Sequence, residues 1–299
     1  MEILPQLIAV AIVSSALYSL IATGLTMTFG ILEFIHFGYG EMAITGAYIF
    51  YTCYMSLGMG LIPSALIALA SVTLIGVVIE KFTFKPVRER HWFIPMTLSI
   101  GIAIILQSAM TIFYGGNSRN YYASGETAKT FELFNGSVII TDVQIAIVLI
   151  AIACLLAVGY FLKYSRTGKA ARAVADDRDI AAIMGINVDK TISTIFGLGS
   201  LLAVVAGIML AFDRNLTPTA GMLTTVIGFC AIVLGGVGSF KGAIIGAIII
   251  GFAETLVIGL TPLSNSYKEI VIFTILLLTI LIRPYGLFGG TKEEVESRK

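Results

Sequence analysis

Charge is what this sequence lacks most. Only 12% of its 299 residues are charged and 57% are hydrophobic, whereas soluble domains carry roughly a quarter charged residues. The mean hydropathy is +0.95. The formal net charge is only +1, so the sequence gives no indication of the broad basic surface that binds nucleic acid. We therefore expect an integral membrane protein with no nucleic-acid partner.

Cysteine and histidine are also scarce, with three and two residues respectively. Cys53, Cys154 and Cys230 each lie inside an apolar stretch, with no C-x-x-C pair and no histidine at metal-ligand spacing. We predict that they are small buried apolar residues, and we expect no metal and no cofactor. An intramembrane enzyme is disfavoured because His36 and His91 lie beside predicted cytoplasmic connections, not facing each other at depth.

Nucleotide-binding motifs are absent as well. No G-x-x-x-x-G-K-[ST] occurs, and the pair Gly236 and Gly238 does not extend to G-x-G-x-x-G because Lys241 occupies the third glycine position. The chain is therefore predicted not to be an enzyme. Energy for any transport must come from a separate subunit or from an ion gradient.

The sequence contains several long apolar runs without charged residues. A helix of about 20 residues crosses the hydrocarbon, and the charge-free run from Met42 to Ile79 is long enough for two, divided at the turn residues 57–63. The predicted spans cover about 4–29, two segments within 42–79, 94–114, 142–163, 191–212, 222–239, 243–261 and 267–284.

These runs predict an all-α, polytopic transmembrane helix bundle of eight to nine spans, forming one domain over residues 1–299. Two stretches leave the count open, because 30–41 fits a re-entrant segment and the glycine-rich 228–251 fits a broken helix. Gly238, Gly242 and Gly246 recur every four residues, which favours close helix packing.

The basic residues predict an orientation. Fifteen of the 19 Lys and Arg residues fall in one set of connections, and short cytoplasmic loops are enriched in these residues. With nine spans the carboxyl terminus is then cytoplasmic and the amino terminus external. The smaller, external set is Arg119, Lys129, Arg214 and Lys268.

The longest predicted cytoplasmic loop, residues 164–190, has helical signals. Thr167 is expected to cap one short helix, Asp176 or Asp177 a second one, and Gly185 suits the left-handed residue that closes it. In the second helix an apolar face recurs at spacings of three and four, made by Ile180, Ile183 and Met184. From the pattern alone, this face fits equally a helix on the lipid surface and a docking site for another protein.

The same loop resembles the cytoplasmic coupling segment of branched-chain amino acid ABC importer permeases, in the pattern R-x-G-x-x-x-R-A-x-x-x-D-x-x-x-A-x-x-x-G-I. The resemblance implies short helices that sit in a groove of the ATP-hydrolysing subunit and transmit nucleotide-driven closure. The matching positions are Arg166, Gly168, Arg172, Ala173, Asp177, Ala181, Gly185 and Ile186. Ile183, on the apolar face, is added to this candidate coupling site.

Two further stretches are similar to the same family. Residues 35–41 read IHFGYGE where the family has I-N-F-A-H-G-E, so His36 replaces Asn, Gly38 replaces Ala and Tyr39 replaces His. Residues 231–254 and the later RPYGLFG, residues 283–289, are similar to the family's closing segments, which end in R-P-x-G-L-x-G.

Few polar residues fall at possible membrane depth. A carboxylate at mid-bilayer costs about 2.5–3.5 kcal/mol, so Glu254 is expected to face the protein interior or a cavity. Glu33, His36 and Glu41 are expected at the cytoplasmic interface with water available, and Gln107 is expected to form a hydrogen bond between helices. All five are candidate pathway residues.

The resemblance implies a multi-pass permease subunit of the cell (inner) membrane, importing branched-chain or related aliphatic amino acids. The implied partners are ABC ATPase subunits, a second homologous or identical permease subunit, an external substrate-binding protein and membrane lipid. Urea or short-amide permeases look similar in sequence. The rival is a stand-alone secondary transporter or channel, which would relay ions through Glu33, His36, Glu41 and Glu254 but would require two related halves, and no internal repeat is evident.

Overall fold

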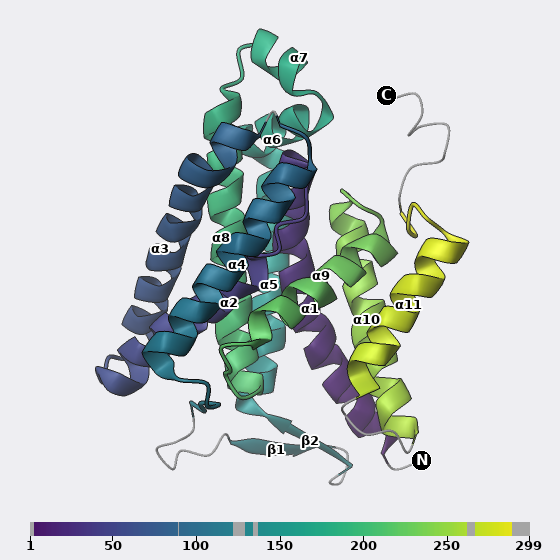
Figure 1. Ribbon diagram of the computed structural model, residues 1–299. Helices are drawn as coiled ribbons and strands as arrows, with labels where there is room; N and C mark the ends of the chain where they lie inside the picture. The colour runs from purple at the N-terminus through teal and green to yellow at the C-terminus, as the bar shows by residue number, and fades with distance from the viewer. Residues whose placement is uncertain (1–2, 89, 122–128, 134–136, 262–266, 289–299) are drawn as a thin grey trace.

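The fold is described from a computed structural model covering residues 3–88, 90–121, 129–133, 137–261 and 267–288 (Figure 1). Gly289 of the closing motif and the predicted cytoplasmic carboxyl terminus lie outside this part of the chain. The described residues form eleven α-helices and one two-stranded hairpin. The helices are α1 (Leu4–Leu32), α2 (Tyr39–Tyr51), α3 (Leu61–Ile79), α4 (Phe93–Tyr114), α5 (Asp142–Tyr164), α6 (Arg166–Asp176), α7 (Arg178–Ile183), α8 (Val188–Asp213), α9 (Ala220–Gly235), α10 (Phe240–Leu260) and α11 (Lys268–Ile282).

The helices coincide with the predicted spans. Six helical segments are long and apolar enough to cross a membrane: α1, α3 with its extension to Val87, α4, α5, α8 and α10. The other three predicted spans fall on α2, α9 and α11, which have 13, 16 and 15 residues. A polytopic helical bundle is thus confirmed, while the count of eight to nine spans stays a prediction.

The two stretches that left the span count undecided, residues 30–41 and 228–251, each contain a turn between two helices. Glu33 adopts a left-handed conformation (φ 62°) and ends α1, and a short connection leads into α2 at Tyr39. Residues 30–41 therefore contain the end of α1, a short connection and the start of α2. The glycine-rich stretch breaks between α9 and α10, where Gly236 and Gly238 have φ values of 108° and 83°. Backbone in this region of φ favours glycine.

The repeating glycines have different tasks. A Cβ on Gly242 would overlap the Gly235 carbonyl oxygen, and one on Gly246 would overlap the Ala231 carbonyl oxygen, so α9 and α10 approach closely as predicted. Close approach through small residues is a common way for membrane helices to associate. The prediction is wrong for Gly238, which lies in open space in the turn before α10.

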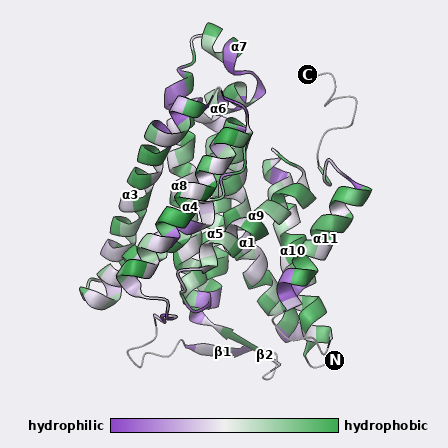
Figure 2. Cartoon of the chain, in the orientation of Figure 1, coloured by the Kyte–Doolittle hydropathy of each residue, from purple (hydrophilic) through white to green (hydrophobic). Residues whose placement is uncertain are grey.

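The bundle has inner and outer helices. In the most apolar windows of α1 and α8, 67% and 72% of the residues are buried, against 17% in α4 and 11% in α5. The outer helices therefore present apolar side chains outward, and their ribbons are mostly in the hydrophobic colour (Figure 2). Such a surface is stable against lipid or another apolar protein surface. α2, α9 and α10 complete the interior by packing on α1 and α8.

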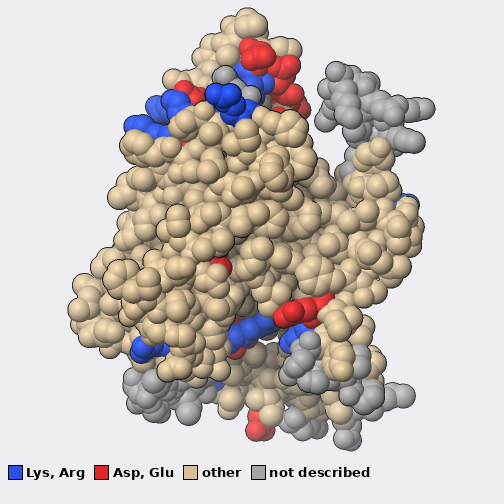
Figure 3. Space-filling model, viewed as in Figure 1, with Lys and Arg blue, Asp and Glu red and all other residues tan. Residues whose placement is uncertain are grey.

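The two ends of the bundle differ. One end carries α6 and α7 and a band of charged side chains (Figures 1 and 3). The other carries the antiparallel hairpin of β1 (Thr130–Leu133) and β2 (Val138–Thr141), which pairs Thr130 with Thr141 and Leu133 with Val138. The sequence did not predict this hairpin, so the chain is not entirely α-helical.

The segment after α11, residues 283–288, lies across the end of α9 and is called the strap below. Its Leu287 and Phe288 N–H groups donate to the Leu234 and Gly235 carbonyl oxygens, both at 2.9 Å. Gly286 (φ 74°) lies directly against Gly236, where a Cβ would overlap the backbone. The described part of the closing motif is therefore structural, because it satisfies carbonyl groups that a helix end leaves free.

Candidate functional site

The first candidate site is the coupling segment, α6 and α7. Ser165 caps α6 by accepting a hydrogen bond from the Gly168 N–H (2.8 Å), so the predicted cap at Thr167 is wrong by two residues. Asp177 caps α7 by accepting from the Ile180 N–H (2.8 Å), and Gly185 has φ 83°, both as predicted. Thr167 is already inside the first turn of α6, where its own backbone is helical.

α7 presents an apolar face away from the protein. The residues Ile180, Ile183 and Met184 are 60%, 84% and 77% exposed, and α7 is the outermost element at this end (Figure 1). Ala181, on the opposite face, is buried. The predicted coupling residues therefore divide into inward anchors and an outward surface.

The other predicted coupling residues hold α6 in place. Gly168 lies so close to α5 that a Cβ would overlap the Phe161 carbonyl oxygen. The Arg172 guanidinium donates to the Leu162 carbonyl oxygen at 2.6 Å. Arg166, the first residue of α6, lines a shallow hollow between this helix and the start of α8. The segment is thus attached to the ends of two long helices.

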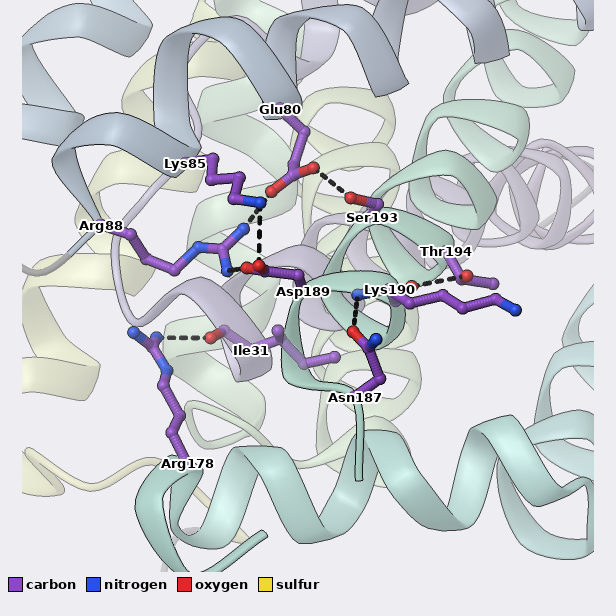
Figure 4. A network of polar contacts seen from close by, with 10 residues as sticks. All are labelled: Ile31, Glu80, Lys85, Arg88, Arg178, Asn187, Asp189, Lys190, Ser193 and Thr194. Atoms are coloured by element: carbon purple, nitrogen blue, oxygen red, sulfur yellow. Dashed lines mark hydrogen bonds and ion pairs between the residues drawn. The ribbon is translucent and has the colours of Figure 1, made fainter. Parts of the chain in front are cut away.

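A polar cluster joins the segment that extends α3, residues 80–88, to α8 beside the coupling segment (Figure 4). The fully buried Glu80 accepts hydrogen bonds from Arg88 and Ser193. Arg88 Nη1 lies 2.9 Å from Asp189 Oδ1, and Lys85 Nζ lies 2.8 Å from Asp189 Oδ2. The sequence missed this cluster, because Glu80 follows an apolar run and looked like the residue that ends a span.

Glu33 belongs to the coupling end. Its carboxylate is exposed and lies 3.9 Å from Arg178 Nη2 of α7, which fits the interface position predicted for it. The same Arg178 nitrogen donates to the Ile31 carbonyl oxygen at 2.6 Å (Figure 4). Arg178 therefore links the coupling segment to the end of α1.

His36 and Glu41 are buried, so their predicted position in contact with water is wrong. Both are 1% exposed. The His36 ring packs between Phe84 and Phe196, with centroid distances of 5.1 and 5.3 Å. The Glu41 carboxylate lies against Gly221 in the first turn of α9, where the helix dipole favours a negative charge. The connection before α2 folds inward because aromatic side chains cover it.

Glu254 is buried inside the opposite half of the bundle, as predicted. Tyr18 Oη donates to Glu254 Oε2 at 2.6 Å, and Lys268 Nζ lies 3.2 Å from Oε1. This trio ties α1, α10 and the first residue of α11 together. Gln107 is half-buried on α4, and within the described residues its side chain has no hydrogen-bonding partner. The interhelical hydrogen bond expected for it is therefore not seen there.

Arg214 extends this trio toward a cavity. Its Nη2 donates to Tyr18 Oη at 3.2 Å, and its Nε lies 3.5 Å from Asp213 Oδ2. The cavity measures about 180 Å³. It lies between α1, α2, α8 and α9, and its lining residues include Tyr18, Ile21, Ile44, Leu210, Arg214, Asn215, Leu223, Thr224 and Ile227. The sequence counted Arg214 only as an external loop cation.

The proposed ion relay is not assembled. Glu33 contacts α7 at the coupling end, whereas Glu254 contacts Tyr18 and Lys268 in the other half. Among the described residues, no group of three His, Cys, Asp or Glu side chains is arranged to hold a metal ion. The geometry thus offers an exposed apolar face at one end and a cavity with a cation in its wall at the other.

Comparisons with known proteins find relatives along most of the chain. The chain is 35% identical over 298 residues to the high-affinity branched-chain amino acid transport system permease protein LivH of Escherichia coli (strain K12), covering 93% of this chain and 92% of that one. It is 32% identical to BraD, the corresponding permease protein of Pseudomonas aeruginosa, over 93% of both chains.

The fold also matches a solved structure, PsaBC from Streptococcus pneumoniae in complex with Fab, with a TM-score of 0.51 over 94% of both chains at 15% identity. At this identity the match concerns the fold alone. A sequence model of the family "Branched-chain amino acid transport system / permease component" matches residues 7–280. With its apolar spanning helices, the chain is a multi-pass membrane protein that belongs to this family of transport-system permease components.

Proposed function

We propose that the chain imports branched-chain or related aliphatic amino acids as the membrane-spanning subunit of an ATP-driven transporter. ATP is hydrolysed on separate subunits, a second permease subunit completes the pathway, and an external binding protein delivers the substrate. The family supports the substrate class. The exposed apolar face of α7 carries the proposal that an ATPase docks here.

α7 is built to present that face. A six-residue helix is too short to be stable alone, and here the Asp177 cap and the Arg178 contact to Ile31 hold it. Burying one large aliphatic side chain contributes about 1.5–3 kcal/mol. A fixed apolar tip with three such side chains, beyond the ends of the spans, is therefore a good docking surface.

The contacts of the segment suggest how docking moves the spans. α6 packs on the end of α5, Arg178 bonds to the end of α1, and α8 begins at Val188, five residues after α7. Movement of α7 toward or away from the membrane would pull on these three helices together. Alternating access then follows from the rearrangement of α1 and α8, in a bundle of eight to nine spans with a cytoplasmic carboxyl terminus.

A pull-down in mild detergent tests the docking. The tagged permease is co-expressed with its ATP-hydrolysing subunits, and Ile183→Asp is expected to abolish their co-purification, because it places a charge in an apolar contact. The matched control is Leu57→Asp, which changes an exposed leucine (66%) in the turn before α3. Wild-type permease that binds no ATPase and transports alone in liposomes, driven by a gradient, would overturn the proposal.

A further inference from the structure

We propose that the cavity beside Arg214 is a binding site for a zwitterionic aliphatic amino acid, with its α-carboxylate on the guanidinium and its side chain on the aliphatic wall. The inference rests on the proposed function and adds where, and by which residues, this chain holds its substrate. It concerns a residue that the sequence did not single out.

Arg214 is positioned to receive a carboxylate. Arginine offers five N–H donors and keeps its charge at every physiological pH. Its Nη2 and Nε are engaged by Tyr18 and Asp213, and within the described residues Nη1 has no other partner. The side chain is 37% exposed, so a ligand in the cavity can reach it.

Tyr18 and Glu254 fix that guanidinium. Because the Tyr18 hydroxyl donates its proton to Glu254, its oxygen is left to accept from Arg214. Lys268 holds the other Glu254 oxygen. The cation is therefore oriented before a ligand arrives, which lowers the entropy lost on binding.

The rest of the cavity selects an aliphatic side chain. Ile21, Ile44, Leu210, Leu223 and Ile227, from four helices, form the apolar wall. Each CH₂ group buried there contributes about 0.8 kcal/mol. A sugar would leave hydroxyl groups unpaired against this wall, and a neutral amide such as urea would neither fill it nor match the charge of Arg214.

The size and the remaining polar groups fit a single amino acid. The cavity volume of about 180 Å³ lies below the roughly 300–1,000 Å³ of drug-sized sites. Asn215 and Thr224 also line it, and Thr224 donates its hydroxyl proton to the Ala220 carbonyl oxygen. The Thr224 oxygen can thus accept a hydrogen bond from the substrate ammonium group.

The site also has a mechanical connection to the coupling end. Arg214 directly follows α8, and Asp189 of the Glu80 cluster lies in the first turn of the same helix. A shift of α8 caused at the coupling end would change the position of Arg214 against α1 and α9. This arrangement allows substrate release to follow ATP-driven movement.

The first test is import of radiolabelled leucine by the complete transporter in proteoliposomes. Arg214→Gln is expected to lower the import rate at subsaturating leucine about ten- to one-hundredfold, the range of a lost charge-assisted hydrogen bond, and Arg214→Lys to retain part of it. The matched control is Arg119→Gln, whose side chain donates to the Tyr114 carbonyl oxygen outside the cavity; it should import at the wild-type rate.

The second test is specificity, which an unfolded or poorly expressed variant does not shift. Ile227→Ala removes part of the apolar wall and enlarges the cavity, which favours the larger of two aliphatic side chains. With the same binding protein throughout, the ratio of leucine to valine import should therefore rise about threefold or more. If the wild type imports leucine but this ratio and the Arg214→Gln rate stay unchanged, the cavity assignment is overturned and the proposed function stands. If the wild type imports no aliphatic amino acid, both are overturned.

Discussion

Two buried glutamates stand in opposite halves of the bundle with partners of the same kind. Glu80 accepts from the hydroxyl of Ser193 and pairs with Arg88. Glu254 accepts from the hydroxyl of Tyr18 and pairs with Lys268. Each carboxylate thus has one hydroxyl and one cation, and each joins helices that are distant in the sequence.

The two clusters differ in what they lead to. From Glu80 the contacts run through Arg88 to the exposed Asp189 at the surface, so this cluster braces the extension of α3 against α8 beside the coupling segment. From Glu254 they run through Tyr18 to Arg214 in a cavity wall. The two carboxylates have similar partners, so what distinguishes a structural cluster from a candidate binding site is whether the next residue lies at the surface or in a cavity wall.

The largest loss of folding stability is expected from Glu80→Ala. It leaves Arg88, whose side chain is 8% exposed, without its buried partner, and breaking such a pair costs about 3–5 kcal/mol. Glu254→Ala should cost less, because the Lys268 side chain is 34% exposed and keeps contact with water. Thermal unfolding of the purified variants in detergent measures both.

The control for this pair is the double variant Glu80→Leu with Arg88→Leu, which removes both charges and should recover most of the lost stability. Equal destabilisation by Glu80→Ala and Glu254→Ala would contradict the expectation that the Glu80 cluster contributes more to stability than the Glu254 cluster.

An intermediate effect is expected from Tyr18→Phe. The variant removes the hydrogen bond to Glu254 and the acceptor of Arg214, at about 1.5–3 kcal/mol for a bond to a charged group, and it should also slow leucine import. Ser193→Ala removes the corresponding hydroxyl at Glu80 and should affect stability alone. A Tyr18→Phe transporter with reduced stability and unchanged import would show that both clusters are braces.

The smallest effect is expected from Lys85→Ala. Lys85 and Asp189 are 46% and 53% exposed, and exposed ion pairs contribute about 0–1 kcal/mol. The change in melting temperature should be small and should shrink further in high salt, because salt screens exposed charges. A large, salt-independent loss would mean that the surface part of the Glu80 cluster is as important as its buried part.

Much of the fold was predictable from apolar runs and turn residues. The six longest helices coincide with predicted spans because hydrocarbon length sets the run length, and Asp177 and Gly185 were identified because caps act locally. The apolar face of Ile183 and Met184 was visible as a helical spacing.

What sequence reasoning missed depends on contacts between distant segments. Glu254 and Tyr18 are 236 positions apart, and Arg214 and Tyr18 are 196 apart. No local pattern reports such pairs. His36 was expected in water because it follows a predicted span, but Phe84 and Phe196 cover it from two other helices. The hairpin β1–β2 was missed because it lies in a polar connection between two spans.

The strap over α9 has a consequence for the order of assembly. α9 ends at Gly235, but its last carbonyl groups receive their donors from Leu287 and Phe288, more than fifty residues later in the chain. During synthesis that helix end must wait, bonded to water or to a transient partner, until α10 and α11 have both entered the membrane. A chain shortened before Arg283 would therefore still contain α1 to α11 but lack the closure of α9.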